Sequence, residues 1–189
     1  GYGRGVARTR KLFAALTRRG PNKVLRGDLA FAGIPGVVYT PESGFNLPGV
    51  AFGHDWLTDV GHYHRTLEHL ASWGIVAAAP DTERGVAPSV LNLAYDLGTT
   101  LDIVAGVRLG PGQISVHPTK LAVAGHGFGG AGIGEIKREG GGTEEENEHA
   151  EVSEIWFHCG CQGGQNKPLL ISAGPEQGSF SADRAAERR

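Results

Sequence analysis

Residues 121–130, LAVAGHGFGG, place a short apolar run directly before a glycine-rich turn. A run in which every residue is apolar is typical of a strand buried on both faces of a parallel sheet. Glycines stand two residues before and two residues after Gly127. Glycines at this spacing let the backbones of a strand and of the following helix approach each other around a strained central residue. The stretch therefore predicts a strand–turn–helix unit centred on Gly127.

The segments upstream of this turn alternate between strand-like and helix-like patterns. Apolar runs bounded by turn residues predict strands at 36–40, 48–52 and 75–79. Apolar residues at helical spacing predict helices at 62–73 and 89–107. Residues 41–47, PESGFNL, predict a loop. Strands that alternate with helices indicate an α/β domain with a doubly wound, mostly parallel sheet.

The first 27 residues differ in charge from the rest of the chain. Residues 1–27 hold eight basic side chains and no acidic one, which leaves ten basic against 20 acidic residues, a net charge of −10, over residues 28–189. Val6, Leu12, Phe13 and Leu16 are spaced as on a short amphipathic helix. We expect this segment to pack on the domain, on a protein partner or on an anionic membrane surface. Nucleic-acid binding is not expected, because no recognisable reading module is present.

The C-terminal third predicts less regular structure. Residues 135–167 are rich in Gly and Glu and predict an acidic loop, and residues 168–173, PLLISA, predict one more buried strand. A chain without Met that ends shortly afterwards predicts a fragment, with a sheet truncated or incomplete at its C-terminal end. No apolar run is long enough to span a membrane and no secretory signal is recognisable. We therefore expect a cytoplasmic protein, with peripheral membrane contact as the alternative.

Three blocks of this chain carry a resemblance to a known family: FGHDWL at 52–57, HLASWGIVAAAPDT at 69–82 and HPTKLAVAGHGFGG at 117–130. In order and spacing they resemble the dienelactone-hydrolase-type esterases and the related chlorophyllase or cutinase-like α/β-hydrolases of actinobacteria, over residues 36–134. The resemblance implies an α/β-hydrolase sheet and identifies the turn at Gly127 as the family's nucleophile elbow.

The same resemblance assigns the other parts of a hydrolase site. Residues 54–56 take the place of the family's His-Gly-aromatic turn, so the backbone N–H groups of Trp56 and Phe128 would form an oxyanion hole. Glu176, after the strand predicted at 168–173, is the candidate acid. The nucleophile position is Gly127, which has no side chain to attack a carbonyl. His126 precedes it, where side chains normally point away from the pocket, and no histidine follows His158.

Because the nucleophile and the downstream histidine are not found, the sequence predicts a protein of ester-hydrolase ancestry that is weakly active or inactive. Loss of either group removes up to about 10⁶ of the kcat of a triad enzyme. A small ester is the expected ligand, and no cofactor is expected. The alternative is a non-catalytic binding or structural subunit that contacts a protein partner or a membrane surface through residues 1–27.

A metal site is the less favoured interpretation of two other clusters. His158, Cys159 and Cys161 could bind a soft ion, but structural zinc sites usually draw ligands from two separated pairs, so idle thiols are preferred. On a helix over 62–73, His62 and His64 would lie about 200° apart, and His62 and His69 would share one face but lie two turns apart, so these histidines predict a solvated face. Asp81 follows the strand at 75–79, where a turn-stabilising or capping role is preferred to ligand binding.

Overall fold

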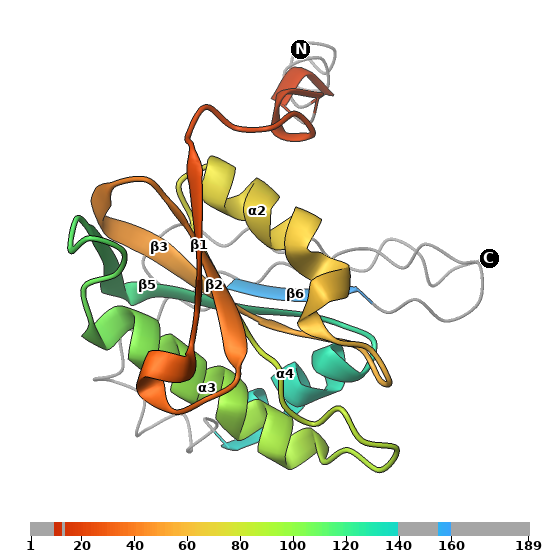
Figure 1. The fold of residues 1–189 in the computed structure, drawn as a ribbon. Helices are drawn as coiled ribbons and strands as arrows, with labels where there is room; N and C mark the ends of the chain where they lie inside the picture. Colours follow the sequence, from red (N-terminus) through yellow and green to blue (C-terminus); the bar gives the residue numbers. More distant parts are fainter. Residues whose placement is uncertain (1–9, 13, 140–154, 160–189) are drawn as a thin grey trace, which may run out of the picture.

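The computed structural model describes residues 10–12, 14–139 and 155–159, and beyond Ile133 only the backbone. The described residues form a six-stranded sheet in the order β1-β2-β4-β3-β5-β6 (Figure 1). Its strands are β1 Val24–Asp28, β2 Gly36–Pro41, β3 Gly44–Gly53, β4 Val76–Pro80, β5 Ile114–His126 and β6 Ile155–Cys159. Strands β4, β3, β5 and β6 pair in parallel, whereas β2 is antiparallel to both of its neighbours.

Helices cover both faces of this sheet, as the alternating pattern predicted. Helix α2, His64–Ser72, packs on one face against β2 and β4. Helices α3, Val90–Gly106, and α4, Phe128–Glu139, pack on the other face. Two short 3₁₀ helices, η1 Ala30–Ala32 and η2 Val60–Tyr63, lie in the connections between the other elements. The fold is therefore a layered α/β domain with a largely parallel sheet.

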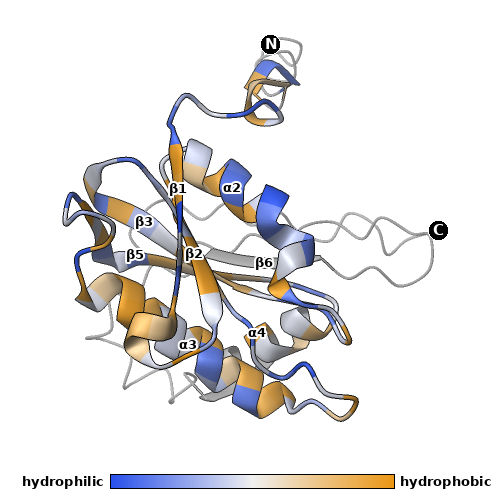
Figure 2. Ribbon diagram, in the orientation of Figure 1, coloured by the Kyte–Doolittle hydropathy of each residue, from blue (hydrophilic) through white to orange (hydrophobic). Residues whose placement is uncertain are grey.

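The buried segments of the central strands, 49–52 of β3, 76–80 of β4 and 122–124 of β5, are apolar because each of their faces meets a helix layer. In β3, Val50 and Phe52 lie in the core cluster that includes Leu67 of α2, whereas Ala51 between them packs with Leu93 and Leu97 of α3. Side chains of a strand point alternately to opposite faces, so burial on both sides requires an unbroken apolar run. In Figure 2, α3 shows hydrophobic residues interspersed with hydrophilic ones, which fits a helix with one face on the sheet.

The helix boundaries follow local signals in the sequence. Ser89 caps α3, because its Oγ accepts a hydrogen bond from the backbone N–H of Asn92 at 3.2 Å. The predicted helix over 62–73 is divided into η2 and α2, and it ends before Gly74, whose φ is +87°. A left-handed residue directly after a helix is favourable for glycine and costs other residues free energy.

Two predictions along the sheet need correction. The predicted loop at 41–47 is shorter, because β3 begins at Gly44, where the backbone N–H bonds to the carbonyl of Gln113 at 3.0 Å. Helix α4 and strand β6 extend into the range 135–167 that was predicted as an acidic loop. A glycine in a helix costs about 1 kcal/mol relative to alanine. Gly132, however, lies against Leu93 of α3 and Ile133 is buried, and this packing offsets the cost.

The N-terminal segment is anchored to α2 by its last residues. Residues 10–12 and 14–16 are helical, and the chain then bonds to the C-terminal end of α2. The indole N–H of Trp73 donates to the carbonyl of Arg18 at 3.0 Å, and the hydroxyl of buried Ser72 accepts the N–H of Gly20 at 2.8 Å. Leu12 remains 58% exposed. Within the described ranges, no helix combines the length and apolarity that crossing a membrane requires.

Candidate functional site

The turn that follows β5 has the strained geometry that its sequence predicts. Strand β5 ends at His126, helix α4 begins at Phe128, and Gly127 between them has a φ of +53°. The carbonyl of Gly127 accepts the N–H of Gly130 at 3.0 Å, which closes the first turn of the helix. The left-handed region that Gly127 occupies is costly for residues with a side chain.

Glycines bring three backbone segments together behind this turn. A Cβ atom at Gly125 would lie 2.5 Å from the carbonyl carbon of Gly129, as the spacing of these two glycines predicts. A Cβ atom at Gly129 would lie 2.1 Å from the carbonyl oxygen of Gly53, at the end of β3. Real Cβ atoms do not make contacts this short. The end of β3, the end of β5 and the first turn of α4 can therefore approach one another only where the facing residues are glycines.

Two backbone N–H groups converge on one carboxylate oxygen beside Gly127. The N–H of Phe128 donates to Oδ1 of Asp55 at 2.8 Å, and the N–H of Trp56 donates to the same atom at 2.7 Å. These are the two donors that the resemblance to α/β-hydrolases assigned to an oxyanion hole. The structure therefore brings both donors to one point, and the atom bound there belongs to the protein itself.

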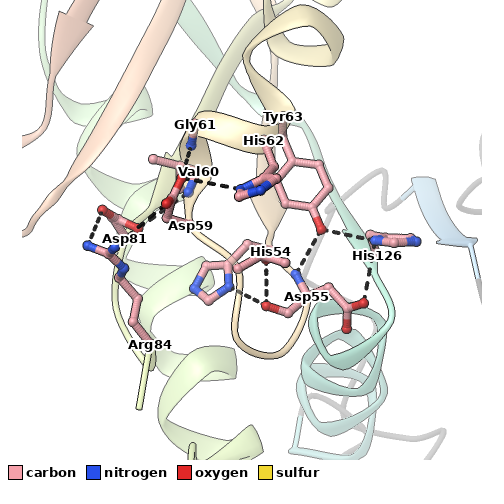
Figure 3. Close-up of polar contacts among 11 residues, drawn as sticks. His54, Asp55, Asp59, Val60, Gly61, His62, Tyr63, Asp81, Arg84 and His126 are labelled. Atoms are coloured by element: carbon pink, nitrogen blue, oxygen red, sulfur yellow. Dashed lines mark hydrogen bonds and ion pairs between the residues drawn. The ribbon is translucent and has the colours of Figure 1, made fainter. Parts of the chain in front are cut away.

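Tyr63 and His126 surround the same carboxylate. The hydroxyl of Tyr63 accepts the backbone N–H of Asp55 at 3.0 Å and lies 2.9 Å from Nδ1 of His126 (Figure 3). That nitrogen is also 3.7 Å from Oδ2 of Asp55, which is within ion-pair distance but too long for a hydrogen bond. The side chains of Asp55 and His126 are 34% and 31% exposed, so solvent reaches both.

The main chain of Asp55 is held in place by further bonds. Its carbonyl accepts the hydroxyl of Thr58 at 2.7 Å and lies 2.8 Å from Nδ1 of His54. His54 is fully buried, and its Nε2 lies 2.6 Å from the carbonyl of Thr82 in the loop after β4. Because a neutral imidazole donates through one nitrogen, either tautomer bonds one of these carbonyls. His54 belongs to the loop after β3, and its buried ring packs against the loop after β4, with a hydrogen bond to Thr82 in the Nε2–H tautomer.

A second group of charges lies on the outer side of these loops. The carboxylate of Asp59 accepts the N–H of Gly61 at 2.7 Å, and this bond, more than the nearby His62 and Arg84, holds the pKa of Asp59 below its usual value. Asp81 accepts the N–H of Val60 at 3.4 Å and pairs with Arg84 at 3.3 Å. Asp81 therefore stabilises the start of η2, the structural role that was preferred for it.

The remaining candidate residues are in β6 or outside the described residues. His158 and Cys159 are in β6, where their backbones pair with Gly125 and His126 of β5. Cys161 and the candidate acid Glu176 lie outside the described residues, as does the strand predicted at 168–173. In the part of the chain that is described, no three His, Cys, Asp or Glu side chains gather as metal ligands would.

Sequence reasoning missed three members of the cluster: Asp55, Tyr63 and His126. Asp55 was noted only as part of the turn that replaces a His-Gly-aromatic sequence, and its acidic side chain at a glycine position was the available signal. His126 was expected to point away from the site, but its ring lies beside Tyr63 and Asp55. Tyr63 carried no signal, because it was counted among the apolar residues of a helix.

Comparisons of the sequence with known protein families and with curated proteins find no match.

Proposed function

We propose that this chain is an α/β-hydrolase-type domain of ester-hydrolase ancestry that does not turn over esters through a serine-type nucleophile. The observation that carries the proposal is the convergence of the Trp56 and Phe128 N–H groups beside a left-handed residue between a buried strand and a helix. That combination is what a nucleophile elbow with its oxyanion hole requires. A general strand-to-helix turn would not need a donor from the loop after the neighbouring strand.

The absence of turnover follows from the residue at the centre of the turn. Gly127 offers no hydroxyl or thiol, and the described residues next to it are an imidazole, a phenol and a carboxylate that already accepts two hydrogen bonds. Without nucleophile and base, a triad site retains about 10³–10⁴ of rate over water, from the oxyanion hole and from binding. Here Asp55 accepts the hydrogen bonds of both oxyanion donors, so even this residual rate enhancement should be small.

The test measures turnover and covalent labelling on the unmodified chain. We expect hydrolysis of short-chain p-nitrophenyl esters to match that of free imidazole at the concentration of the eight histidines, and intact mass to be unchanged after a fluorophosphonate probe. A known serine esterase serves as the positive control. Turnover well above the imidazole control together with a covalent adduct would refute the proposal, and the position of the adduct would identify the nucleophile.

A second candidate function is contact with a partner through the N-terminal segment. The observation that favours it is the anchoring of this segment at Gly20 and Trp73, while Leu12 and Leu16 stay exposed beside basic residues. An amphipathic basic helix suits an anionic lipid surface. Co-sedimentation with phosphatidylserine vesicles and with neutral phosphatidylcholine vesicles tests it, with a Leu12→Glu variant as control. Sedimentation of the wild type with either vesicle that does not exceed sedimentation without lipid would exclude the membrane as the partner.

A further inference from the structure

The carboxylate of Asp55 fills the space that a side chain at the centre of the elbow would need. A Cβ atom placed on Gly127 would lie 2.0 Å from Oδ1 of Asp55, 2.4 Å from Cγ and 2.7 Å from Oδ2. All three atoms of the carboxylate are thus within the volume of a nucleophile's first side-chain atoms. The same carboxylate takes both N–H donors through Oδ1.

The hydrogen bonds of the Asp55 side chain differ from those of an ordinary Asx turn. In an Asx turn the side chain bonds the backbone two residues further along the chain. Asp55 instead bonds the N–H of the next residue, Trp56, and that of Phe128, 73 positions away. Its backbone N–H is held by Tyr63 and its carbonyl by Thr58, so only rotation of the side chain can remove the carboxylate from the elbow.

We propose that Asp55 is an internal ligand that closes the elbow. One carboxylate fills both the place of the missing nucleophile and the paired N–H groups that would otherwise accept a carbonyl oxygen. Positions 55 and 127 are therefore coupled, because the space between them can hold the side chain of only one of the two residues. An external carboxylate or acyl oxygen reaches the donors only when Asp55 leaves them. The inference deepens the proposed function, but the occupancy of the donors by Asp55 can be tested without it.

The first experiment follows the two donor amides by NMR during a pH titration of the wild-type chain. Amide protons that donate to a carboxylate move upfield when the carboxyl is protonated. We expect the Trp56 and Phe128 amide protons to move together, with one common midpoint. The step should vanish in Asp55→Asn, whose amide oxygen can accept the same bonds without titrating.

The second experiment asks whether the donors accept an external carboxylate once Asp55 is removed. Formate added to Asp55→Gly should shift the Trp56 and Phe128 amides in a saturable way, whereas formate added to the wild type should not. If Asp55→Gly does not fold, Asp55→Ser takes its place in the formate experiment. The amide titration of the wild type does not depend on either variant. Different midpoints for the two amides, or a formate shift of the same size in the wild type, would overturn the proposal. Ester turnover by the wild type would instead refute the proposed function while leaving this titration unchanged.

Discussion

Replacing Gly127 with serine should destabilise the domain far more than the same replacement at an unhindered glycine. The new Cβ would meet the Asp55 carboxylate at 2.0–2.7 Å, which is shorter than any tolerable contact. The carboxylate has to move away, because the backbone at Gly127 is fixed by the close approach of Gly125 and Gly129 behind it. Its departure breaks the bonds from Trp56 and Phe128.

The expected cost has two parts. A serine in the left-handed region at φ +53° costs about 1–2 kcal/mol. A hydrogen bond to a charged group contributes about 1.5–3 kcal/mol, but the Asp55 side chain is 34% exposed and water replaces part of the pair, so we count about 2 kcal/mol for both bonds. The sum is about 3–4 kcal/mol, which corresponds to a fall in Tm of roughly 6–16 °C for a chain of this length.

Gly112 provides the matched control. Its φ is +85° and a Cβ atom there meets nothing within 4 Å, so Gly112→Ser carries the backbone strain of about 1–2 kcal/mol without the collision. The second control is Asp55→Gly, alone and combined with Gly127→Ser. Since the two bonds can be lost only once, the double variant should be about 2 kcal/mol more stable than the sum of the single changes predicts.

Urea unfolding followed by circular dichroism measures all four variants against the wild type. The reasoning is refuted if Gly127→Ser costs no more than Gly112→Ser, or if the effects at positions 55 and 127 are additive. Either result would mean that the carboxylate does not occupy the centre of the elbow in solution. A lower stability with an unchanged denaturant slope would show that the native fold is retained and only weakened.

Three further predictions concern the supports of the site. Gly129→Ala should abolish soluble folded protein, because its Cβ would lie 2.1 Å from a backbone oxygen. The control Gly98→Ala, at an open position of α3, should raise the free energy of unfolding by up to about 1 kcal/mol. Equal melting curves for the two variants would contradict this prediction. His54→Ala should cost about 2–4 kcal/mol in urea unfolding, because a fully buried ring that packs against the loop after β4 is lost, and a change below about 0.5 kcal/mol would argue against that packing. The pKa of Asp59 is lowered mainly by the Gly61 N–H, so its carboxylate stabilises the fold above the unfolded-state pKa, and this contribution is lost as pH falls through the folded-state pKa. NMR titration of the Asp59 carboxyl carbon should show the lowered pKa, and a normal value would contradict the bond.

The sequence predicted the elbow well because its signals are local. Gly125 and Gly129 stand at the fixed spacing that a strand-to-helix turn requires, and Gly127 stands where a left-handed residue is needed. The helix over 89–107 was predicted within one residue at each end, since Ser89 caps it and its apolar stripe has helical spacing. Steric and periodic requirements of this kind act between residues that are near in the chain.

Sequence reasoning failed where the partner is distant in the chain. Gly53 matters because Gly129, 76 positions later, packs on its carbonyl, and no local pattern contains that contact. Strand β6 was assigned to a loop because its pairing partner is the distant strand β5, and pairing across a sheet is not visible in a run of five residues.

The turn at Gly127 therefore has two levels of explanation. The sequence by itself determined that a buried strand leads through a glycine turn into a helix, and that no nucleophile stands at its centre. Only the tertiary structure decided what fills that centre, because Asp55 reaches Phe128 across 73 residues once β3 and β5 lie side by side. A carboxylate and two N–H groups meet there because the parallel strands bring their carboxyl ends to one edge of the sheet.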